Sequence, residues 1–475
     1  MRPSNSTTTH AATILAEKAK SSHFWRGATL YEECITANES ILQEADAIYT
    51  YGYELLGLSF SVYLHRVIEH VAKFEIDHLI FVAREGYLFE KIYTILKAQL
   101  PAHLTAEVTS AYAYLSRVST FLASTPQLTT REIELITYKF NQKGLWSALS
   151  YIGLPVAEFE PLAAEHGIIM QQPVRDYWND HKLLSFLNDN RVQQKVQKYH
   201  QQSRDNLYTY LEQCQFWGKD RKVALIDIGW DGTIQDNLVR SFNHLPEFPL
   251  LHGLYFGRRN MKPVLRYSGS FSNGLIFDRR DYDINGESIG SCATIFEKAA
   301  GAPHASTIGH QKLANGTVTP RFKSEQSYSR QGEIAADASV AVLQQGILDF
   351  AQQYAERVGN RTGDRSASTP TTYSPIAETY TPFVRSLITR HIVFPTHQEA
   401  ALIANQLGQF SEDMGEDTLR KVAVTASELQ SLIKKGKFKA IKRAVNASTW
   451  RSATVKLLGI PGLHFLYVLK RFLFF

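Results

Sequence analysis

The chain has only three cysteines among its 475 residues, and Cys34, Cys214 and Cys292 lie far apart. The absence of a CxxC pair excludes a cysteine zinc site of the usual spacing, and an odd number of distant cysteines argues against a disulfide framework. No run approaches the roughly 20 apolar residues that span a bilayer. A secretory signal has a basic start followed by an apolar run. The first 25 residues do not show this pattern. We therefore expect a cytoplasmic protein.

Acidic residues are missing from the C-terminal end. Residues 429–475 contain ten Lys and Arg and no Asp or Glu, whereas residues 1–428 contain 41 basic and 46 acidic residues. The net charge of +5 thus comes from the tail, and we expect no nucleic-acid partner for the mildly acidic body. Large apolar side chains follow the basic run 434–443, as in segments that lie on an anionic membrane. The alternative is a basic helix packed on the acidic body.

Several standard site motifs are also absent. The sequence contains no GxxxxGK[ST], GxGxxG, HExxH or GxSxG, which removes the common signatures of nucleotide-binding loops, zinc proteases and serine hydrolases. Asp227, Gly229 and Asp231 resemble the start of a calcium loop, but position twelve is Leu238 rather than Glu.

Short continuous apolar runs are typical of buried parallel strands, and segments of helical period lie between them. Strands are expected at 78–83, 109–115, 222–227, 250–256 and 267–277. Helices are expected at 51–74, 87–99 and 234–242. This order predicts an α/β fold with a parallel, Rossmann-like sheet, an inserted helical lobe and a helical C-terminal region.

The predicted organisation along the chain has four parts. They are a polar N-terminal lead-in (1–45), an α/β core (46–310) with a helical insertion (126–218), a helical region (311–428) with a flexible loop (360–374), and a basic amphipathic tail (429–475).

The first turn with candidate ligand-binding residues is Arg84-Glu85-Gly86, between a predicted strand and a predicted helix. In open α/β sheets, ligands bind outside the carboxyl ends of the strands, where helix N-termini offer free N–H groups to phosphate. Arg84 offers a planar fork for phosphate or carboxylate, Glu85 a carboxylate, and Gly86 close backbone approach. The alternative is that Arg84 pairs with Glu85 or with another surface acid.

The second turn runs from Asp227 to Thr233. Asp227 ends a predicted strand, Gly229 and Gly232 free the backbone, Asp231 adds a carboxylate and Thr233 a hydroxyl. This set is suited to Mg²⁺, a sugar diol or phosphate, with Asp227 and Asp231 as the metal ligands. Alternatively, Asp227 and Thr233 simply cap the helix.

Two further positions complete the candidate site. Glu297 and His304 bracket one loop and would serve as acid and base, although a histidine beside proline is more often a structural hydrogen-bonding group. Arg117 is a candidate anion contact, or else a solvated surface arginine. We therefore expect Asp227, Asp231, Glu297 and His304 to be catalytic. The expected phosphate-binding residues are Arg84, Glu85, Gly86, Arg117, Gly229, Gly232 and Thr233.

An ordered set of segments resembles a bacterial family usually labelled "HAD superfamily hydrolase", whose members occur among glycosyltransferases in surface-polysaccharide gene clusters. The segments are Tyr51–Gly57, Phe81–Leu88, Tyr114–Arg117, Leu225–Gln235 and Phe296–His304. The resemblance spans roughly residues 50 to 310 and implies a phosphate-ester-binding enzyme of polysaccharide synthesis, with glycosyltransferases as partners.

The chain departs from that family at two points. The family's usual turn is Ala-Arg-Asp-Gly, and here Glu85 replaces the aspartate. Longer members carry an N-terminal phosphatase domain with an Asp-x-Asp nucleophile, for which this chain has no room. Asp231-Gly232-Thr233 fits the end of a haloacid-dehalogenase motif, but Gly229 stands at the nucleophile position. The hydrolase label therefore fits the missing domain better.

The two turns are also similar to those of phosphoribosyltransferase-like folds, in which an Arg/Gly turn holds pyrophosphate and an acidic strand end with a Gly/Thr loop holds ribose phosphate.

These patterns and resemblances leave three hypotheses for the function. They are phosphoester hydrolysis or group transfer on a phosphorylated sugar or nucleotide-like molecule, a phosphoribosyltransferase-like transfer, and a non-catalytic scaffold for glycosyltransferases. In each, the basic tail would hold the protein peripherally at the inner face of the cytoplasmic membrane.

Overall fold

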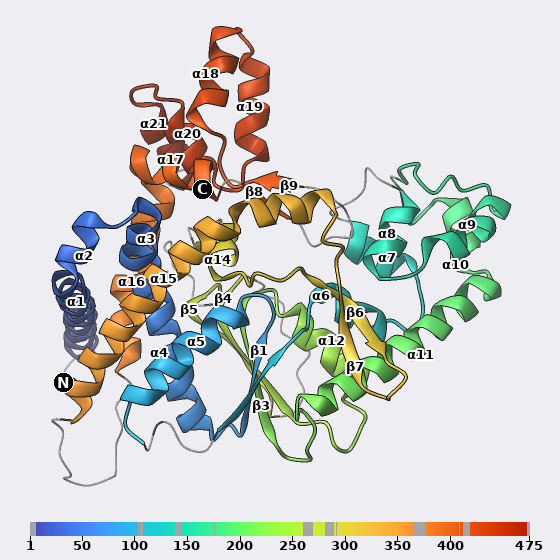
Figure 1. The fold of residues 1–475 in the computed structure, drawn as a ribbon, viewed down its shortest axis with the longest axis horizontal. Coiled ribbons are helices and arrows are strands. Elements are labelled where there is room, and N and C mark those ends of the chain that lie inside the picture. The colour runs from blue at the N-terminus through green and yellow to red at the C-terminus, as the bar shows by residue number, and fades with distance from the viewer. Residues whose placement is uncertain are drawn as a thin grey trace.

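The centre of the molecule is a five-stranded, all-parallel sheet in the order β2-β1-β3-β4-β5 (Figure 1). The strands are β1 (His78–Val82), β2 (Thr109–Ala113), β3 (Lys222–Trp230), β4 (Leu250–Arg258) and β5 (Ser272–Asp278). The predicted α/β class with a parallel sheet is confirmed. The computed structural model describes residues 6–102, 104, 108–137, 144–174, 176–259, 269–280, 289–290, 292–363, 376–407, 409–411 and 419–472.

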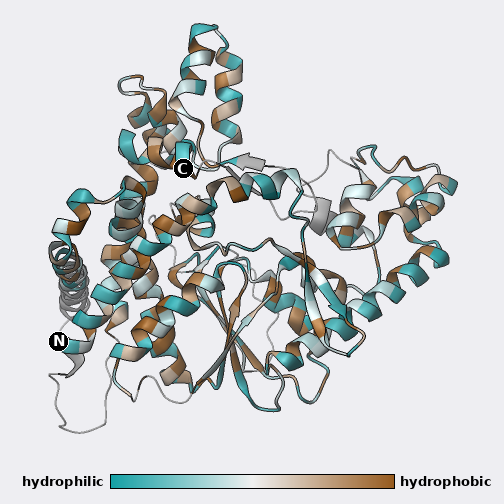
Figure 2. Cartoon of the chain, in the orientation of Figure 1, coloured by the Kyte–Doolittle hydropathy of each residue, from teal (hydrophilic) through white to brown (hydrophobic). Residues whose placement is uncertain are grey.

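Helices cover both faces of the sheet, which explains the continuous apolar runs of its strands. Successive side chains of a strand point to opposite faces. In β1, Leu79 and Phe81 join one core with α4 and α5, whereas Ile80 and Val82 join a second core with α11 and α12. These helices are α4 (Leu58–Phe74), α5 (Gly86–Gln99), α11 (Asn190–Gln213) and α12 (Thr233–Phe242). Figure 2 shows the hydrophobic residues along the strands and the facing helices.

The strand order reverses between β1 and β3. From β1 the chain crosses through α5 to β2 on one side, and from β3 it crosses through α12 to β4 on the other. Because α5 and α12 pack on opposite faces, the fold is doubly wound, with its switch point between β1 and β3.

The predicted helical insertion forms a lobe with a core of its own, built around buried side chains such as Phe159 and Phe186. After β2 come α6 (Arg117–Phe121) and the 3-10 turn η2 (Leu122–Ser124). The lobe then contains α7 (Thr130–Thr137), α8 (Leu145–Tyr151), α9 (Val156–Glu165), α10 (His181–Leu187) and the start of α11.

The predicted polar N-terminal lead-in (1–45) is largely helical. Most of it is one helix, α1 (Ser6–Ala37), which packs along α16 (Ala377–Val393) and buries Leu30 and Cys34 in the main core. Three short elements, α2 (Glu39–Glu44), α3 (Ala47–Tyr51) and the π-helix η1 (Gly52–Gly57), lead into α4. A helix whose apolar residues are few can still pack by a narrow face, which composition alone does not reveal.

The helix α15 (Tyr328–Gly363) is long and apolar enough, by length and composition, to cross a membrane. Here it packs against α3, η1, α4 and α5, and Leu343, Ile347 and Phe350 are fully buried. Packing inside the fold thus accounts for its apolar residues. The helix continues through Gly363, and residues 364–374 of the predicted flexible loop lie outside the described residues.

The region after the sheet is not purely helical. It includes an antiparallel hairpin of β6 (Thr307–Lys312) and β7 (Val318–Phe322) and a second of β8 (Gln409–Ser411) and β9 (Leu419–Lys421). Two helices, α14 (Ala293–Ala300) and α17 (His397–Gln406), complete this region.

The basic tail folds into four helices, α18 (Ala426–Lys434), α19 (Phe438–Ala447), α20 (Arg451–Leu457) and α21 (Leu463–Phe472). Its inner part packs on the body: Trp450 is buried, and its indole N–H donates to the carbonyl oxygen of Ile392 at 2.9 Å. The segment therefore combines a packed inner side with an exposed outer side that carries the lysines.

Candidate functional site

The two turns singled out from the sequence lie side by side. Arg84-Glu85-Gly86 follows β1 and Asp227–Thr233 follows β3, and these strands pair directly, with Phe81 opposite Ile226. Both turns thus leave the same edge of the sheet at the switch point, where doubly wound folds bind their ligands.

Gly86 allows the first turn because its backbone packs directly against that of Phe81. A Cβ at this position would lie 2.6 Å from the carbonyl carbon of Phe81, so any side chain would collide with the strand backbone. Gly86 is buried as the first residue of α5 and does not line the cavity described below. Its role is to let the helix begin directly above β1. The peptide bond between Ala83 and Arg84 in this turn is cis.

The second turn depends on Gly229 and Gly232, which have φ angles of 99° and 71°. A Cβ at Gly229 would lie 2.4 Å from the carbonyl oxygen of Gly257, its pairing partner on β4. This close approach lets β3 continue to Trp230, three residues beyond its predicted end at Asp227. Gly232 then serves as the N-cap of α12, whose first residue is Thr233.

A cavity of about 480 Å³ opens above the two turns. This volume falls in the range of small-molecule sites. Of the eleven predicted site residues, nine line it: Arg84, Glu85, Arg117, Asp227, Gly229, Asp231, Gly232, Thr233 and Glu297. The sequence pattern therefore located one contiguous surface from segments more than 200 residues apart.

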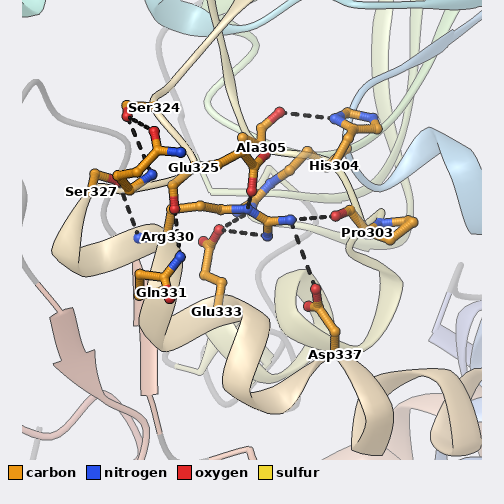
Figure 3. Close-up of polar contacts among 12 residues, drawn as sticks. Pro303, His304, Ala305, Ser324, Glu325, Ser327, Arg330, Gln331, Glu333 and Asp337 are labelled. Carbon is orange, nitrogen blue, oxygen red and sulfur yellow. Dashed lines mark hydrogen bonds and ion pairs between the residues drawn. The ribbon is translucent and has the colours of Figure 1, made fainter.

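His304 does not line this cavity. Its Nε2 forms a hydrogen bond of 2.7 Å with the hydroxyl of Tyr112. Its Nδ1 forms one of 2.8 Å with the carbonyl oxygen of Ala305 (Figure 3). Burial lowers its pKa. Because both ring nitrogens are already engaged, the geometry fits the structural alternative better than the predicted acid–base role.

Arg84 forms an ion pair with an acid that is distant in the sequence. Its Nη1 lies 2.9 Å from Oε2 of Glu333 on α15. The same carboxylate lies 3.4 Å from Nη1 of Arg330, whose guanidinium also approaches Asp337 at 3.7 Å and donates to the carbonyl oxygen of Pro303 (Figure 3). This network forms the wall of the cavity opposite the sheet.

Arg330, Glu333 and Asp337 were missed by the sequence analysis, although their spacing of three and four residues places them on one helix face. The lining also includes Arg259, Lys298 and Arg471. Lys298 in α14 is partly buried, and this burial lowers its pKa. In total, seven basic and six acidic side chains line the cavity, so it presents both charges to a ligand.

Asp227 and Glu297 are the two carboxylates best placed for proton chemistry. Burial, and next the nearby carboxylate of Glu85, raise the pKa of Asp227 well above its ordinary value. Glu297 is held in place by Trp230, whose indole N–H donates to Oε1 at 2.9 Å. A raised carboxyl pKa beside a second, oriented carboxylate is the usual arrangement for acid–base work near neutral pH.

The outer part of the second turn is held by Arg259. Its guanidinium lies 5.4 Å from the centre of the Trp230 ring and 3.8 Å from the carboxylate of Asp231. Its backbone N–H donates to the carbonyl oxygen of Trp230 at 2.7 Å. Asp231 thus lies at the rim, half exposed, rather than beside Asp227 on the strand.

Arg117 reaches the cavity from the turn after β2, the strand next to β1. It is the first residue of α6, which is capped by Ser116 in a capping box with Ser119. The hydroxyl of Ser116 also donates to the carbonyl oxygen of Thr307 at 2.7 Å, which ties this turn to β6. Arg117 therefore has a fixed backbone and a side chain on the cavity wall.

Within the described ranges, no group of three or more His, Cys, Asp or Glu side chains is arranged to hold a metal ion. Magnesium commonly takes one or two carboxylates together with substrate phosphates. Asp227 and Asp231 remain the predicted ligands in that form, in which the substrate supplies the remaining oxygens.

Comparison of the chain with known protein-family models and with functionally curated proteins gives no match.

Proposed function

We propose that this protein is a phosphate-ester-binding enzyme that transfers a group from a phosphorylated sugar or nucleotide-like donor during synthesis of a bacterial cell-surface polysaccharide. The observation that carries the proposal is the meeting of the two glycine turns at the switch point, around one cavity that contains Arg84 and Arg117. The resemblance to proteins of surface-polysaccharide gene clusters supplies the biological setting.

The donor's phosphate would be held from two sides. Arg117 offers a guanidinium that bonds two phosphate oxygens at once. On the other side, Gly232 and Thr233 begin a ten-residue helix, whose first N–H groups and dipole attract an anion. Asp227 and Asp231 would bind sugar hydroxyls, or Mg²⁺ brought in with the phosphate.

Transfer is favoured over haloacid-dehalogenase hydrolysis by the second turn. That hydrolysis needs a carboxylate nucleophile two residues before Asp231, and this position is Gly229, whose space is filled by the backbone of Gly257. In a transfer, a bond forms between an acceptor hydroxyl oxygen and the donor carbon while the carbon–phosphate oxygen bond breaks. Glu297 would take the hydroxyl proton, and the arginines would meet the charge on the departing phosphate.

A phosphoribosyltransferase-like reaction is a specific form of this proposal. It is favoured by the pairing of an acidic strand end, Asp227, with the glycine and threonine of the same turn, opposite the Arg84 turn. A non-catalytic scaffold for glycosyltransferases is the competing function, and it predicts either an empty cavity or ligand binding without turnover.

The test is a thermal-shift screen of the purified protein against sugar phosphates, nucleotide sugars, sugar diphosphates and pyrophosphate, with and without Mg²⁺. We expect at least one phosphorylated ligand to raise the melting temperature, and Arg117→Ala to abolish that rise. The matched control is Arg131→Ala, which removes an exposed arginine of the helical lobe and should leave the rise intact. No stabilisation by any phosphorylated ligand, or equal stabilisation of Arg117→Ala, would contradict the proposal.

Turnover separates the enzyme from the scaffold. The ligand that stabilises the protein is incubated with cell-envelope acceptor lipids, and release of its phosphate or diphosphate is measured for the wild type and for Glu297→Gln. Release that needs both the acceptor and Glu297 supports transfer, whereas binding without release supports the scaffold.

A further inference from the structure

The outer side of the C-terminal helices carries a concentrated positive patch. Six basic residues of the α18–α19 hairpin are exposed: Lys434, Lys435, Lys437, Lys439, Lys442 and Arg443. None of them forms an ion pair with another residue in the described part of the chain, and no acidic residue follows Glu428 in the sequence. Glu428, the acidic residue of α18, pairs with Lys421, so the patch keeps its net positive charge.

Large apolar side chains are exposed on the same C-terminal segment as this patch. Phe438, at the start of α19, is 73% exposed, and α19 has no buried residue at all. Near the turn between α20 and α21, Ile460, Phe465 and Leu466 are 51–61% exposed. Single exposed apolar residues are common on protein surfaces. Four large ones on one short C-terminal segment that also carries six exposed cations mark an interaction surface.

We infer that this surface docks the protein on an anionic lipid bilayer. Lysines attract the phosphate headgroups, and Phe438 with the Ile460–Leu466 turn would enter the boundary between headgroups and acyl chains. A nucleic acid would also attract the lysines, and bases stack on exposed aromatic rings such as those of Phe438 and Phe465, but the aliphatic Ile460 and Leu466 offer neither base stacking nor hydrogen bonds. The charge and the apolar residues together favour lipid.

The same helices form part of the cavity, which connects docking with the proposed reaction. The C-terminal end of α19 and the following turn, Asn446–Thr449, line the cavity together with Arg451 and Arg471. Helix α19 has ten residues, so Phe438 and the cavity wall are about 15 Å apart along its axis. Figure 1 shows α18 to α21 at one end of the molecule, above the carboxyl edge of the sheet. Docking there would bring the cavity close to a lipid-linked acceptor.

The experiment is co-sedimentation of the full-length protein with vesicles of phosphatidylcholine, with or without phosphatidylglycerol. We expect the wild type to pellet with the anionic vesicles and to remain soluble with phosphatidylcholine alone. The triple variant Lys434→Ser/Lys435→Ser/Lys437→Ser should lower the partition coefficient about 100-fold, because each basic residue at an anionic surface contributes about a factor of five.

A matched triple variant controls for the loss of charge. Lys182→Ser/Lys198→Ser/Lys219→Ser removes three exposed lysines from other parts of the molecule and should pellet like the wild type. The double variant Phe465→Ser/Leu466→Ser tests the apolar contribution with the charge intact, and its partition should fall at least tenfold.

Three outcomes would overturn the inference: no pelleting of the wild type with anionic vesicles, equal pelleting of the wild type and the patch variant, or an equal loss in the matched control. Preferential binding of RNA, with vesicles unable to compete, would assign the patch to nucleic acid instead. The vesicle result does not depend on the proposed transfer, because it is measured without donor or acceptor.

Discussion

Arg84 and Glu333, which lie 249 residues apart in the sequence, form an ion pair of 2.9 Å across the cavity. Arg84 belongs to the turn after β1, and Glu333 belongs to the helix α15 on the opposite wall. The side chain of Glu333 is only 6% exposed and also contacts Arg330, so one carboxylate orients two guanidinium groups beside the proposed phosphate position.

Removing that carboxylate should destabilise the fold. We expect Glu333→Gln to lower the free energy of unfolding by about 3 kcal/mol, because it leaves two buried or half-buried cations with a neutral partner. Urea denaturation measures the change. The control is Glu378→Gln, which removes a 67% exposed carboxylate lying 4.0 Å from Arg66 and should cost about 0–1 kcal/mol. An equal cost for both variants would show that Glu333 does not hold the network.

The buried carboxyl group of Asp227 should lower the free energy of unfolding at neutral pH. Its pKa is raised in the folded protein, mainly by burial, so the folded state binds a proton that the unfolded state has released. The stability of the wild type should therefore fall as the pH rises from about 4, the ordinary pKa of an aspartate, toward the raised value.

Asp227→Asn has no such proton to release. We expect it to be more stable than the wild type at pH 7 and equal to it below about pH 4, while losing ligand-induced stabilisation. Urea unfolding at a series of pH values provides the measurement. A variant that is less stable than the wild type at every pH would mean that the charged carboxylate is favourably held, contrary to our account.

The second turn should not tolerate a side chain at Gly229. Gly229→Ala combines a φ of 99° with a Cβ placed 2.4 Å from the carbonyl oxygen of Gly257. Gly316→Ala is the matched control, since Gly316 has a φ of 86° and open space around its Cβ position. The two variants share the backbone strain, so the difference between them isolates the collision. We expect Gly229→Ala to cost about 1–3 kcal/mol more in thermal or urea unfolding; an equal cost would contradict the close approach.

The sequence predicted the parts of the fold that depend on local pattern. Unbroken apolar runs identified β1, β3 and β4, because a strand covered on both faces needs no polar residue. Strand order is set by long-range pairing, however, and nothing in a local run showed that β1 and β3 would be neighbours at the point of reversal. The extension of β3 to Trp230 was missed for a similar reason, since it depends on Gly229 meeting Gly257 on another strand.

The sequence likewise predicted only part of the candidate site. The residues at the edge of the sheet were predicted, because they form glycine turns beside charged residues. The opposite wall was not, because Glu333 and Arg471 come from distant helices whose charged faces look like ordinary solvated surface. His304 illustrates the converse: its sequence context gave a reason for catalysis, and only the tertiary contact with Tyr112 shows that its ring is engaged elsewhere.

The central claim is that Arg117, after β2, and the Asp227–Thr233 turn, after β3, hold one phosphate from two sides. The most direct test is calorimetric titration of the best ligand from the thermal-shift screen into two single variants. Arg117→Ala alters the first side and Thr233→Val alters the second; circular dichroism checks that both remain folded. Our account predicts that each variant weakens binding by about 10-fold or more, as expected for losing a hydrogen bond to a charged group. Wild-type affinity in either variant would contradict it.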